Sequence, residues 1–249
     1  MKQTVMRTRP AAEPARKVPP PARKPPAPEI SNREKAKAGR RSRIISAVRD
    51  IIRDHGADAL SMKEIGRRAG VSTSTVFNLF GSKHALMLQV FEGDLRSYQA
   101  QVHKLESKDA LDRLFDAVRM VNESFAREPE FHRHVFLNIY GGPDLELRSG
   151  FRGSRVPFWE NLVKEAVAEG FLRADTPTQI FAAGLGHIAR AVVMDWAVGE
   201  ISLDQLEVET GYGFAIALSA IARKSALPRL QEKVAHYARN HRFYPGAQE

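Results

Sequence analysis

The chain contains no cysteine, which excludes disulfide bonds, thiolate metal sites and cysteine nucleophiles. No stretch approaches the roughly 20 uninterrupted apolar residues that a membrane-spanning helix requires. The N-terminus also lacks the apolar core of a secretory signal. Together these absences predict a cytoplasmic protein that does not associate with a membrane.

Groups of residues that would support catalysis or bind a metal are missing as well. His132 and His134 are two residues apart, and His236 and His241 are five apart, so neither pair has the i, i+4 spacing of a helical metal site. The run Gly184–Ala189 matches a dinucleotide-binding glycine pattern, but it follows no predicted strand and lies inside a predicted helix. We therefore expect no metal, no cofactor and no catalytic residue.

The positive charge of the chain lies entirely in its first third. Residues 1–38 hold 10 Lys or Arg against 3 acids, residues 39–92 hold 9 against 5, and residues 93–249 hold 19 against 21. A basic segment beside a nearly neutral body is typical of a nucleic-acid-binding protein that has a separate domain for another task. A basic tail can also serve only to keep a protein soluble, so the charge alone leaves both interpretations open.

Composition and periodicity divide the chain into three predicted parts. Residues 1–37 are rich in Pro, Lys and Arg and poor in large apolar side chains, which predicts a disordered basic arm. Residues 38–98 and 99–249 show helical periodicity without a convincing strand, so we expect an all-α protein with a small N-terminal domain and a larger helical domain. From residue 82 onward, helices are predicted near 82–105, 109–127, 129–139, 153–170, 177–198, 204–225 and 227–240.

Residues 62–80 have the pattern of two short helices joined by a sharp turn. The run Ser61–Glu64 has the form of a capping box at the start of the first helix. Ala69 is a small residue of the kind needed where the two helices cross, and Gly70 can adopt the left-handed conformation of a tight turn. Ser72 can then cap the second helix. These residues predict a helix-turn-helix.

The second helix of this motif is predicted to have one buried and one polar side. Val76 and Phe80 are four residues apart and should pack inward. The opposite side then presents hydroxyl and amide groups that can bond to phosphates and base edges in a major groove. Just past the turn at Gly81, a lysine and the backbone amides of the next helix start can hold a phosphate. The candidate DNA-binding residues are Lys63, Ser72, Thr73, Ser74, Thr75, Phe77, Asn78 and Lys83.

The run from Ser61 to Phe80, followed by Gly81-Ser82-Lys83, resembles the DNA-binding module of the TetR family of bacterial transcriptional regulators. The resemblance covers about residues 38–98. In that family the aromatic residue at position 77 is usually a tyrosine whose hydroxyl contacts a phosphate, and Phe77 cannot make that hydrogen bond. The residue after Lys83 is commonly acidic in the family, and His84 departs from this. The resemblance implies a regulator that binds double-stranded DNA.

For the rest of the chain, the resemblance implies a helical domain that binds a small effector and pairs two copies into a homodimer. Residues 177–198 and 211–222 mix apolar and small side chains, which suits a four-helix bundle between two subunits, although both can also be core helices of a monomer. An aromatic pocket between the middle helices would suit a hydrophobic ligand, although most of these aromatics also fit an ordinary core. The candidate effector-binding residues are Phe115, Phe136, Tyr140, Trp159, Phe181, His187 and Arg190.

The sequence therefore predicts a ligand-responsive homodimeric repressor that a small, hydrophobic effector releases from a palindromic operator by population shift. Two alternatives belong to other classes. One is an interaction protein that coats DNA without sequence choice through its basic arm. The other is an enzyme whose helical body has acquired chemistry, for which the sequence offers nothing beyond a possible pocket. The sequence leaves open the effector, the operator, and activation instead of repression.

Overall fold

The computed structural model describes residues 31–107 and 109–242, which fold almost entirely into helices. The only β pairing within these residues is an isolated antiparallel bridge between Leu172 and Ala222. The predicted all-α class is therefore confirmed. The helices are α1 (Asn32–His55), the short 3-10 helix η1 (Ala57–Ala59), α2 (Met62–Ala69), α3 (Thr73–Phe80), α4 (Lys83–Val102), α5 (Ala110–Arg127), α6 (Pro129–Gly141), α7 (Leu145–Ala168), α8 (Thr178–Val198), α9 (Leu203–Ile221) and α10 (Leu227–Asn240).

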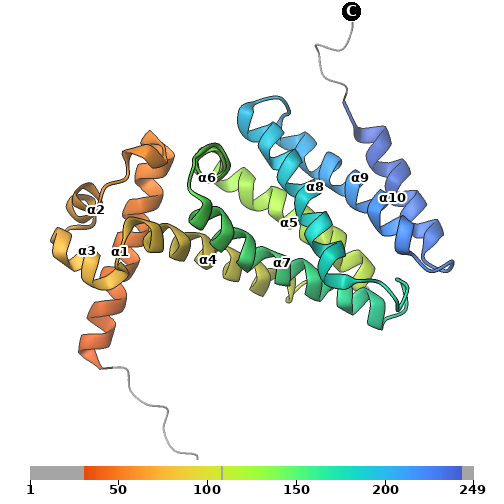
Figure 1. Cartoon of the computed structure of the whole chain (residues 1–249), viewed down its shortest axis with the longest axis horizontal. Coiled ribbons are helices and arrows are strands. Elements are labelled where there is room, and N and C mark those ends of the chain that lie inside the picture. Colours follow the sequence, from red (N-terminus) through yellow and green to blue (C-terminus); the bar gives the residue numbers. More distant parts are fainter. Residues whose placement is uncertain (1–30, 108, 243–249) are drawn as a thin grey trace, which may run out of the picture.

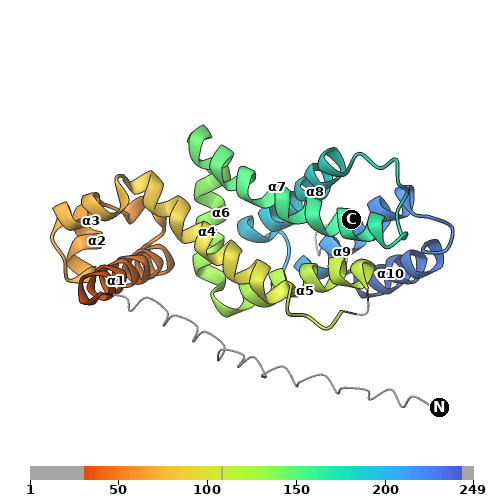
Figure 2. The ribbon, with the colours of Figure 1, turned by 90° about the horizontal axis from the view of Figure 1, so that it is seen from below.

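The molecule is elongated, with a small group of helices at one end and a larger group at the other. Figures 1 and 2 show α1, α2 and α3 together at one end, here named the head, and α5 to α10 at the other, here named the body. Helix α4 runs from the head into the body, and it contacts α1, α3, α5 and α7. The domain boundary predicted at residue 98 therefore falls inside a continuous helix.

Helix α1 begins at Asn32, before the predicted end of the basic arm at residue 37. A complete capping box sets this start: the Ser31 hydroxyl accepts a hydrogen bond from the Glu34 amide at 3.2 Å, and the Glu34 carboxylate accepts one from the Ser31 amide at 3.0 Å. The pattern of Ser followed three residues later by Glu was present in the sequence, but the basic composition around it suggested an arm. Residues 1–30 of the predicted arm lie outside the described residues.

Helix α7 begins at Leu145, well before the predicted start near residue 153. The Asp144 carboxylate caps it by accepting a hydrogen bond from the Leu147 amide at 2.8 Å. Gly150 and Pro157 weaken the local helix signal, because glycine is flexible and proline lacks the N–H that the helix would use. Packing against α4 outweighs this low helix propensity. A Cβ atom at position 150 would lie 2.9 Å from Leu88 of α4, so the glycine permits close contact between α7 and α4.

The buried side chains form two clusters. The first cluster extends from α1, through Ile44 and Ile51, to Phe131 of α6 and Trp196 of α8, so it joins the head to the body. The second cluster lies within the body, where the Trp159 ring meets Phe214 edge-on at 5.1 Å and packs with residues of α5 and α10. Because the first cluster is continuous, the orientation of the head is set by side-chain packing as well as by the α4 connection.

Helix α8 has one buried and one exposed apolar side. In the part of the chain that the structure describes, it alone is long and apolar enough to cross a membrane, by length and composition only. The sequence analysis expected no such stretch because it required an uninterrupted apolar run, and residues such as Arg190 interrupt this one. Helix α8 packs against α6, α7 and α9, with Leu185, Val193 and Trp196 buried. Its outer side leaves Ile180 75% exposed.

Candidate nucleic-acid interface

The turn between α2 and α3 brings two backbone segments into close contact. Gly70 ends α2 in the left-handed conformation (φ 65°, ψ 39°), as the sequence predicted. The Val71 amide donates a hydrogen bond to the Gly66 carbonyl at 3.0 Å. A Cβ atom on Gly66 would lie 2.9 Å from the Val71 carbonyl oxygen and 3.3 Å from the Thr73 amide. The residue that must be small at this crossing is therefore Gly66, which the sequence analysis missed by choosing Ala69. Its signal was a glycine four residues before the turn glycine.

Serine side chains cap α2, α3 and α4. The hydroxyls of Ser61, Ser72 and Ser82 accept hydrogen bonds from backbone amides at 3.1, 3.2 and 3.0 Å. The cap at Ser61 is only half of the predicted capping box, because the Glu64 carboxylate does not return to the Ser61 amide. Glu64 binds two arginines of its own helix instead.

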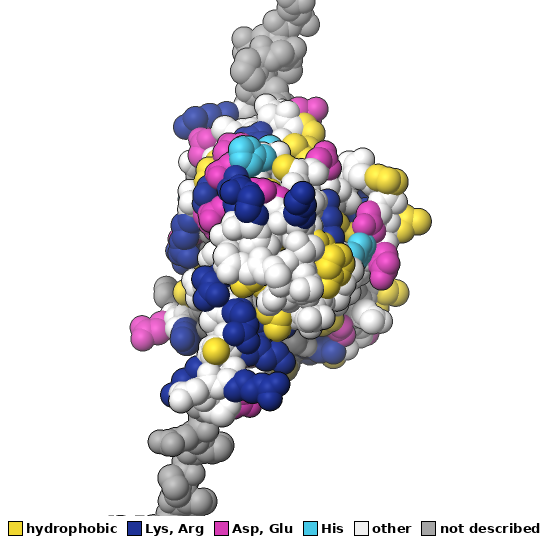
Figure 3. All heavy atoms as spheres, turned by 90° about the vertical axis from the view of Figure 1, so that its left-hand side faces the viewer, with side chains coloured by type: hydrophobic (Ala, Val, Ile, Leu, Met, Phe, Trp, Pro, Cys, Tyr) yellow, Lys and Arg dark blue, Asp and Glu magenta, His cyan; other side chains and the backbone are white. Residues whose placement is uncertain are grey.

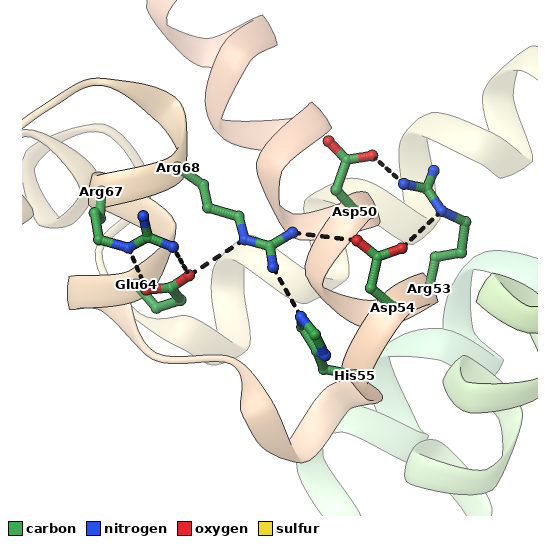
Figure 4. Close-up of polar contacts among 7 residues, drawn as sticks. All are labelled: Asp50, Arg53, Asp54, His55, Glu64, Arg67 and Arg68. Carbon is green, nitrogen blue, oxygen red and sulfur yellow. Dashed lines mark hydrogen bonds and ion pairs between the residues drawn. The ribbon is translucent and has the colours of Figure 1, made fainter.

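Figure 4 shows the polar network that holds α2 against the end of α1. The Glu64 carboxylate accepts hydrogen bonds from Arg67 at 2.6 and 2.7 Å and from Arg68 at 3.2 Å. Arg68 also reaches Asp54 at 3.3 Å and His55 at 2.9 Å in α1. Hydrogen bonds from Arg67, reinforced by Arg68, lower the pKa of Glu64 to about 2. Arg68 thus connects α2, the first helix of the motif, to the C-terminal end of α1.

Helix α3 has the two-sided character that the sequence predicted. Val76 is fully buried and Phe80 almost so, both in the first cluster. Ser74, Phe77 and Asn78 are exposed on the other side. Thr73 and Thr75 are partly buried, and Ser72, which caps the helix, is exposed. The exposed polar side chains therefore lie together on one face of a short, firmly packed helix.

Two features change the expected roles of the polar groups on this face. The Ser72 hydroxyl lies 2.9 Å from the Ser74 hydroxyl and 2.8 Å from that of Thr75, so these three groups already bond to one another. Lys63 is exposed, whereas the Lys83 ammonium donates to the Ala57 carbonyl of η1 at 3.4 Å. A phosphate contact by Lys83 requires it to turn away from that carbonyl.

Figure 3 looks onto the end of the molecule that carries α2 and α3. Lys and Arg side chains lie above and below an area of uncharged side chains and backbone. The exposed cations of the head include Arg33, Lys35 and Lys37 in the first turns of α1 and Arg67 in α2. Polar groups that can read bases, flanked by cations that can bind phosphates, are the arrangement that duplex DNA requires.

Two arginines of α1 that the sequence analysis did not single out support the two helices of the motif. Arg41 of α1 donates to the Leu79 carbonyl at 2.7 Å, and its guanidinium lies 4.4 Å from the centre of the Phe80 ring. Arg43 donates to the Ala69 carbonyl at 3.2 Å, at the end of α2. These contacts satisfy carbonyl groups at the C-terminal ends of both motif helices.

The body contains an aromatic cavity of about 100 Å³ whose wall is formed by α4, α5, α6 and α7. Phe136 and Trp159 are the two predicted effector-binding residues that line it. Phe115 and Phe181 pack in the second cluster, Tyr140 lies behind Phe136 with their ring centres 6.1 Å apart, and His187 and Arg190 are exposed on α8. The lining residues outside the set of seven candidates include other aromatics of the middle helices, Phe125, Phe131, Phe151 and Phe158, and three residues that the sequence analysis did not name, Phe91, Tyr98 and Arg155.

No group of three or more His, Asp or Glu side chains arranged to hold a metal ion occurs among residues 31–107 and 109–242. His132, which also lines the cavity, stacks on Phe125 with ring centres 4.4 Å apart, and its Nδ1 lies 2.9 Å from the Glu128 carbonyl. Burial lowers the pKa of His132, so it is neutral at pH 7. The cavity therefore has an apolar wall with few polar groups.

Residues 44–90 match the model of the bacterial regulatory proteins of the tetR family. The match spans most of α1, the whole helix-turn-helix and the first turns of α4. The helix-turn-helix is thus similar to the DNA-binding module of these bacterial regulators, and the resemblance inferred from Ser61 to Lys83 is confirmed.

Solved structures of bacterial transcriptional regulators share the fold of about three quarters of the chain. FadR from Thermus thermophilus, a repressor in complex with lauroyl-CoA, has 21% sequence identity and a TM-score of 0.61 over 74% of this chain and 96% of its own. FadR from Bacillus subtilis, in complex with stearoyl-CoA, has 16% identity and a TM-score of 0.61 over 72% and 98%. SmeT, the repressor of the Stenotrophomonas maltophilia multidrug efflux pump SmeDEF, has 17% identity and a TM-score of 0.57 over 75% and 92%.

The close approach at Gly66 gives a first prediction. Gly66→Ala should lower the free energy of unfolding by roughly 1–3 kcal/mol, because its methyl group would press on the backbone of the turn. Gly93→Ala is the matched control: it lies inside α4 with open space around it, so it should leave stability unchanged or raise it by up to about 1 kcal/mol. Urea unfolding of both variants measures the difference, and equal stability of Gly66→Ala and the parent would contradict the close crossing.

The Glu64 network gives a second prediction, on acid stability. The pKa of Glu64 in the folded chain is about 2, below its ordinary value of 4.5, so its pairing stabilises the fold above pH 4.5 and is lost as the pH falls towards 2. Glu64→Gln should therefore be less stable than the parent at pH 7 and lose less stability between pH 4.5 and 2. Glu146→Gln, at an exposed position of α7 whose carboxylate pairs with no Lys or Arg in the described residues, should follow the parent. Unfolding followed at a series of pH values tests this, and parallel curves for all three proteins would refute it.

Proposed function

We propose that this chain is a cytoplasmic, ligand-responsive repressor of the TetR family, and not an enzyme, which binds a palindromic site in double-stranded DNA as a homodimer. The observation that carries the proposal is the two-sided packing of α3. Val76 and Phe80 fix the helix to the head, while Asn78 and the hydroxyl-bearing residues beside it face outward. A firmly held helix with an exposed polar side is what major-groove recognition needs.

The outward side of α3 offers several kinds of contact to DNA. The Asn78 amide can pair with adenine through two hydrogen bonds, and Thr73 can reach a base edge or a phosphate. Phe77 is 48% exposed, and its ring can lie against a thymine methyl group. Lys63 and the cations of α1 are suited to phosphates, which position the protein without reading sequence.

Homodimerisation is supported by an apolar surface that α8 and α9 share on the outside of the body. Ile180 and Val198 of α8 are 75% and 56% exposed, and Tyr212 and Ile216 of α9 are 37% and 48% exposed. The two helices pack against each other, so these exposed side chains lie on neighbouring helices. Two copies that pair through this surface would form a four-helix bundle and present two α3 helices to sites about 34–36 Å apart.

The body supports binding of a small hydrophobic effector. Its cavity is lined mainly by aromatic side chains, as expected of a site for an apolar ligand. Two of the similar structures, both FadR proteins, are in complex with acyl-CoA molecules, which carry long apolar chains. We infer that an effector in this cavity favours an arrangement of the heads that no longer matches the operator.

One set of contacts joins the cavity wall to the head. Arg49 of α1 forms an ion pair with Asp94 of α4 at 2.6 Å and another with Glu128, which precedes α6. Its guanidinium also lies 4.1 Å from the centre of the Phe131 ring. Asp94 and Phe131 both line the cavity. An occupant that moves either wall therefore changes the support of α1, and we propose this as the connection between effector and head.

Sequence recognition by α3 is tested by Asn78→Ala and Thr73→Ala. Each should reduce discrimination between the preferred palindrome and random DNA by about 1–3 kcal/mol, which corresponds to roughly 5–150-fold, because a base contact is lost. Ser149→Ala, at an exposed position of α7 in the body, should bind as the parent does. Competition binding at fixed salt measures the ratio of specific to non-specific affinity. A parent that binds every duplex equally would instead favour a protein that coats DNA.

The proposed dimer is tested by placing a charge on its surface. Ile216→Glu should convert the dimer to a monomer and weaken operator binding, because a buried unpaired carboxylate opposes pairing. Leu145→Glu is the matched control, since Leu145 is 73% exposed at the start of α7, away from α8 and α9. Light scattering after size-exclusion chromatography gives the mass of each. A monomeric parent, or a dimer that Ile216→Glu leaves intact, would rule out this surface.

A further inference from the structure

The aromatic cavity contains one strongly basic side chain, Arg155 of α7. It is the only Lys or Arg among the residues that line the cavity, all of which the structure describes. Its guanidinium carbon lies 4.7 Å from the centre of the Phe151 ring and 5.6 Å from that of Phe136. The cation therefore lies against the aromatic wall, on a partly buried side chain.

Arg155 forms no ion pair with any described residue, in contrast to the acidic side chains beside it. Of the two carboxylates that line the cavity, Glu92 pairs with Arg96 at 3.5 Å and Asp94 pairs with Arg49 at 2.6 Å. The group that offsets the burial of Arg155 by a hydrogen bond is the phenol hydroxyl of Tyr140. The cavity thus carries one positive charge that no carboxylate of the described chain balances.

An unbalanced guanidinium in this position has a chemical consequence. Burial lowers the pKa of Arg155, yet a guanidinium stays protonated in proteins, so the charge persists and remains poorly solvated. The neutral His132 supplies no negative charge to balance it. The group that best relieves this cost is an anion, because a carboxylate or phosphate accepts two parallel hydrogen bonds from the guanidinium fork.

We propose that Arg155 binds the anionic head group of an amphipathic effector, whose apolar part lies against the aromatic wall of the cavity. This proposal rests on the effector-binding role proposed for the body and specifies the class of effector: an apolar carboxylate, in preference to a neutral or cationic molecule.

The test compares octanoate with 1-octanol, two probes of equal chain length that differ in the charged head group. Binding to the full-length protein is measured by calorimetry, without DNA, for the parent and for Arg155→Gln. The parent should bind octanoate at least 10-fold more tightly than 1-octanol, and Arg155→Gln should lose about 10-fold or more of the octanoate affinity while its affinity for 1-octanol stays within about 2-fold.

Two further variants separate recognition of the anion from effects on folding or on general charge. Arg152→Gln changes an exposed arginine on the same helix and should bind both probes as the parent does. Arg155→Lys keeps the charge but not the two-pronged donor, so its octanoate affinity should fall between those of the parent and Arg155→Gln. Thermal unfolding of each variant shows whether the fold is retained.

The remaining outcomes overturn the proposal. If Arg155→Gln lost the same factor in affinity for both probes, Arg155 would contribute to packing alone. If the parent bound both probes with equal affinity, the cavity would not select an anion. In both cases the body still binds apolar ligands, so the proposed function stands. Failure of octanoate to bind the parent overturns the proposed carboxylate effector, while operator binding by α3 is measured separately and is unaffected.

Discussion

The arrangement of the head depends on the contact between two backbones at the α2–α3 turn. With no side chain at Gly66, the Val71 carbonyl and the Thr73 amide approach α2 closely, and the left-handed Gly70 completes the turn. Once α3 starts in this place, burial of Val76 fixes its rotation about its own axis. The side that carries Asn78 then has only solvent to face. The polar face is thus a consequence of how closely two short helices can cross.

Local signals predicted this motif well, and they failed where distant contacts decide the structure. Gly70, Ser72 and Val76 could be assigned from the sequence, because each acts within one or two helical turns. The start of α7 could not, since Gly150 is explained only by its contact with Leu88 of another helix. The lining of the cavity was harder still to predict. Four helices contribute to it, and the sequence of one helix does not determine how that helix is rotated relative to the others. Arg155 was therefore not selected.

The arginines of α1 show how net charge can mislead. They contributed to the positive field of the N-terminal third that suggested nucleic-acid binding. In the structure, Arg41 and Arg43 are bound to carbonyl groups at the ends of α3 and α2, and Arg49 is paired with two carboxylates. These cations hold the head together and attach it to the body. The charge available to phosphates is consequently smaller than the sequence count, and in the described head it is concentrated at the start of α1 and at Lys63 of α2.

The hydrophobic cluster that runs from Ile44 to Trp196 restricts how the head can respond to the body. A head attached by a flexible hinge would sample a continuous range of tilts. Here α1 interdigitates with α6, and close-packed side chains exchange partners only in discrete steps. We therefore expect the head to adopt a few discrete orientations relative to the body. Even a small displacement of α6 has to be accommodated at α1.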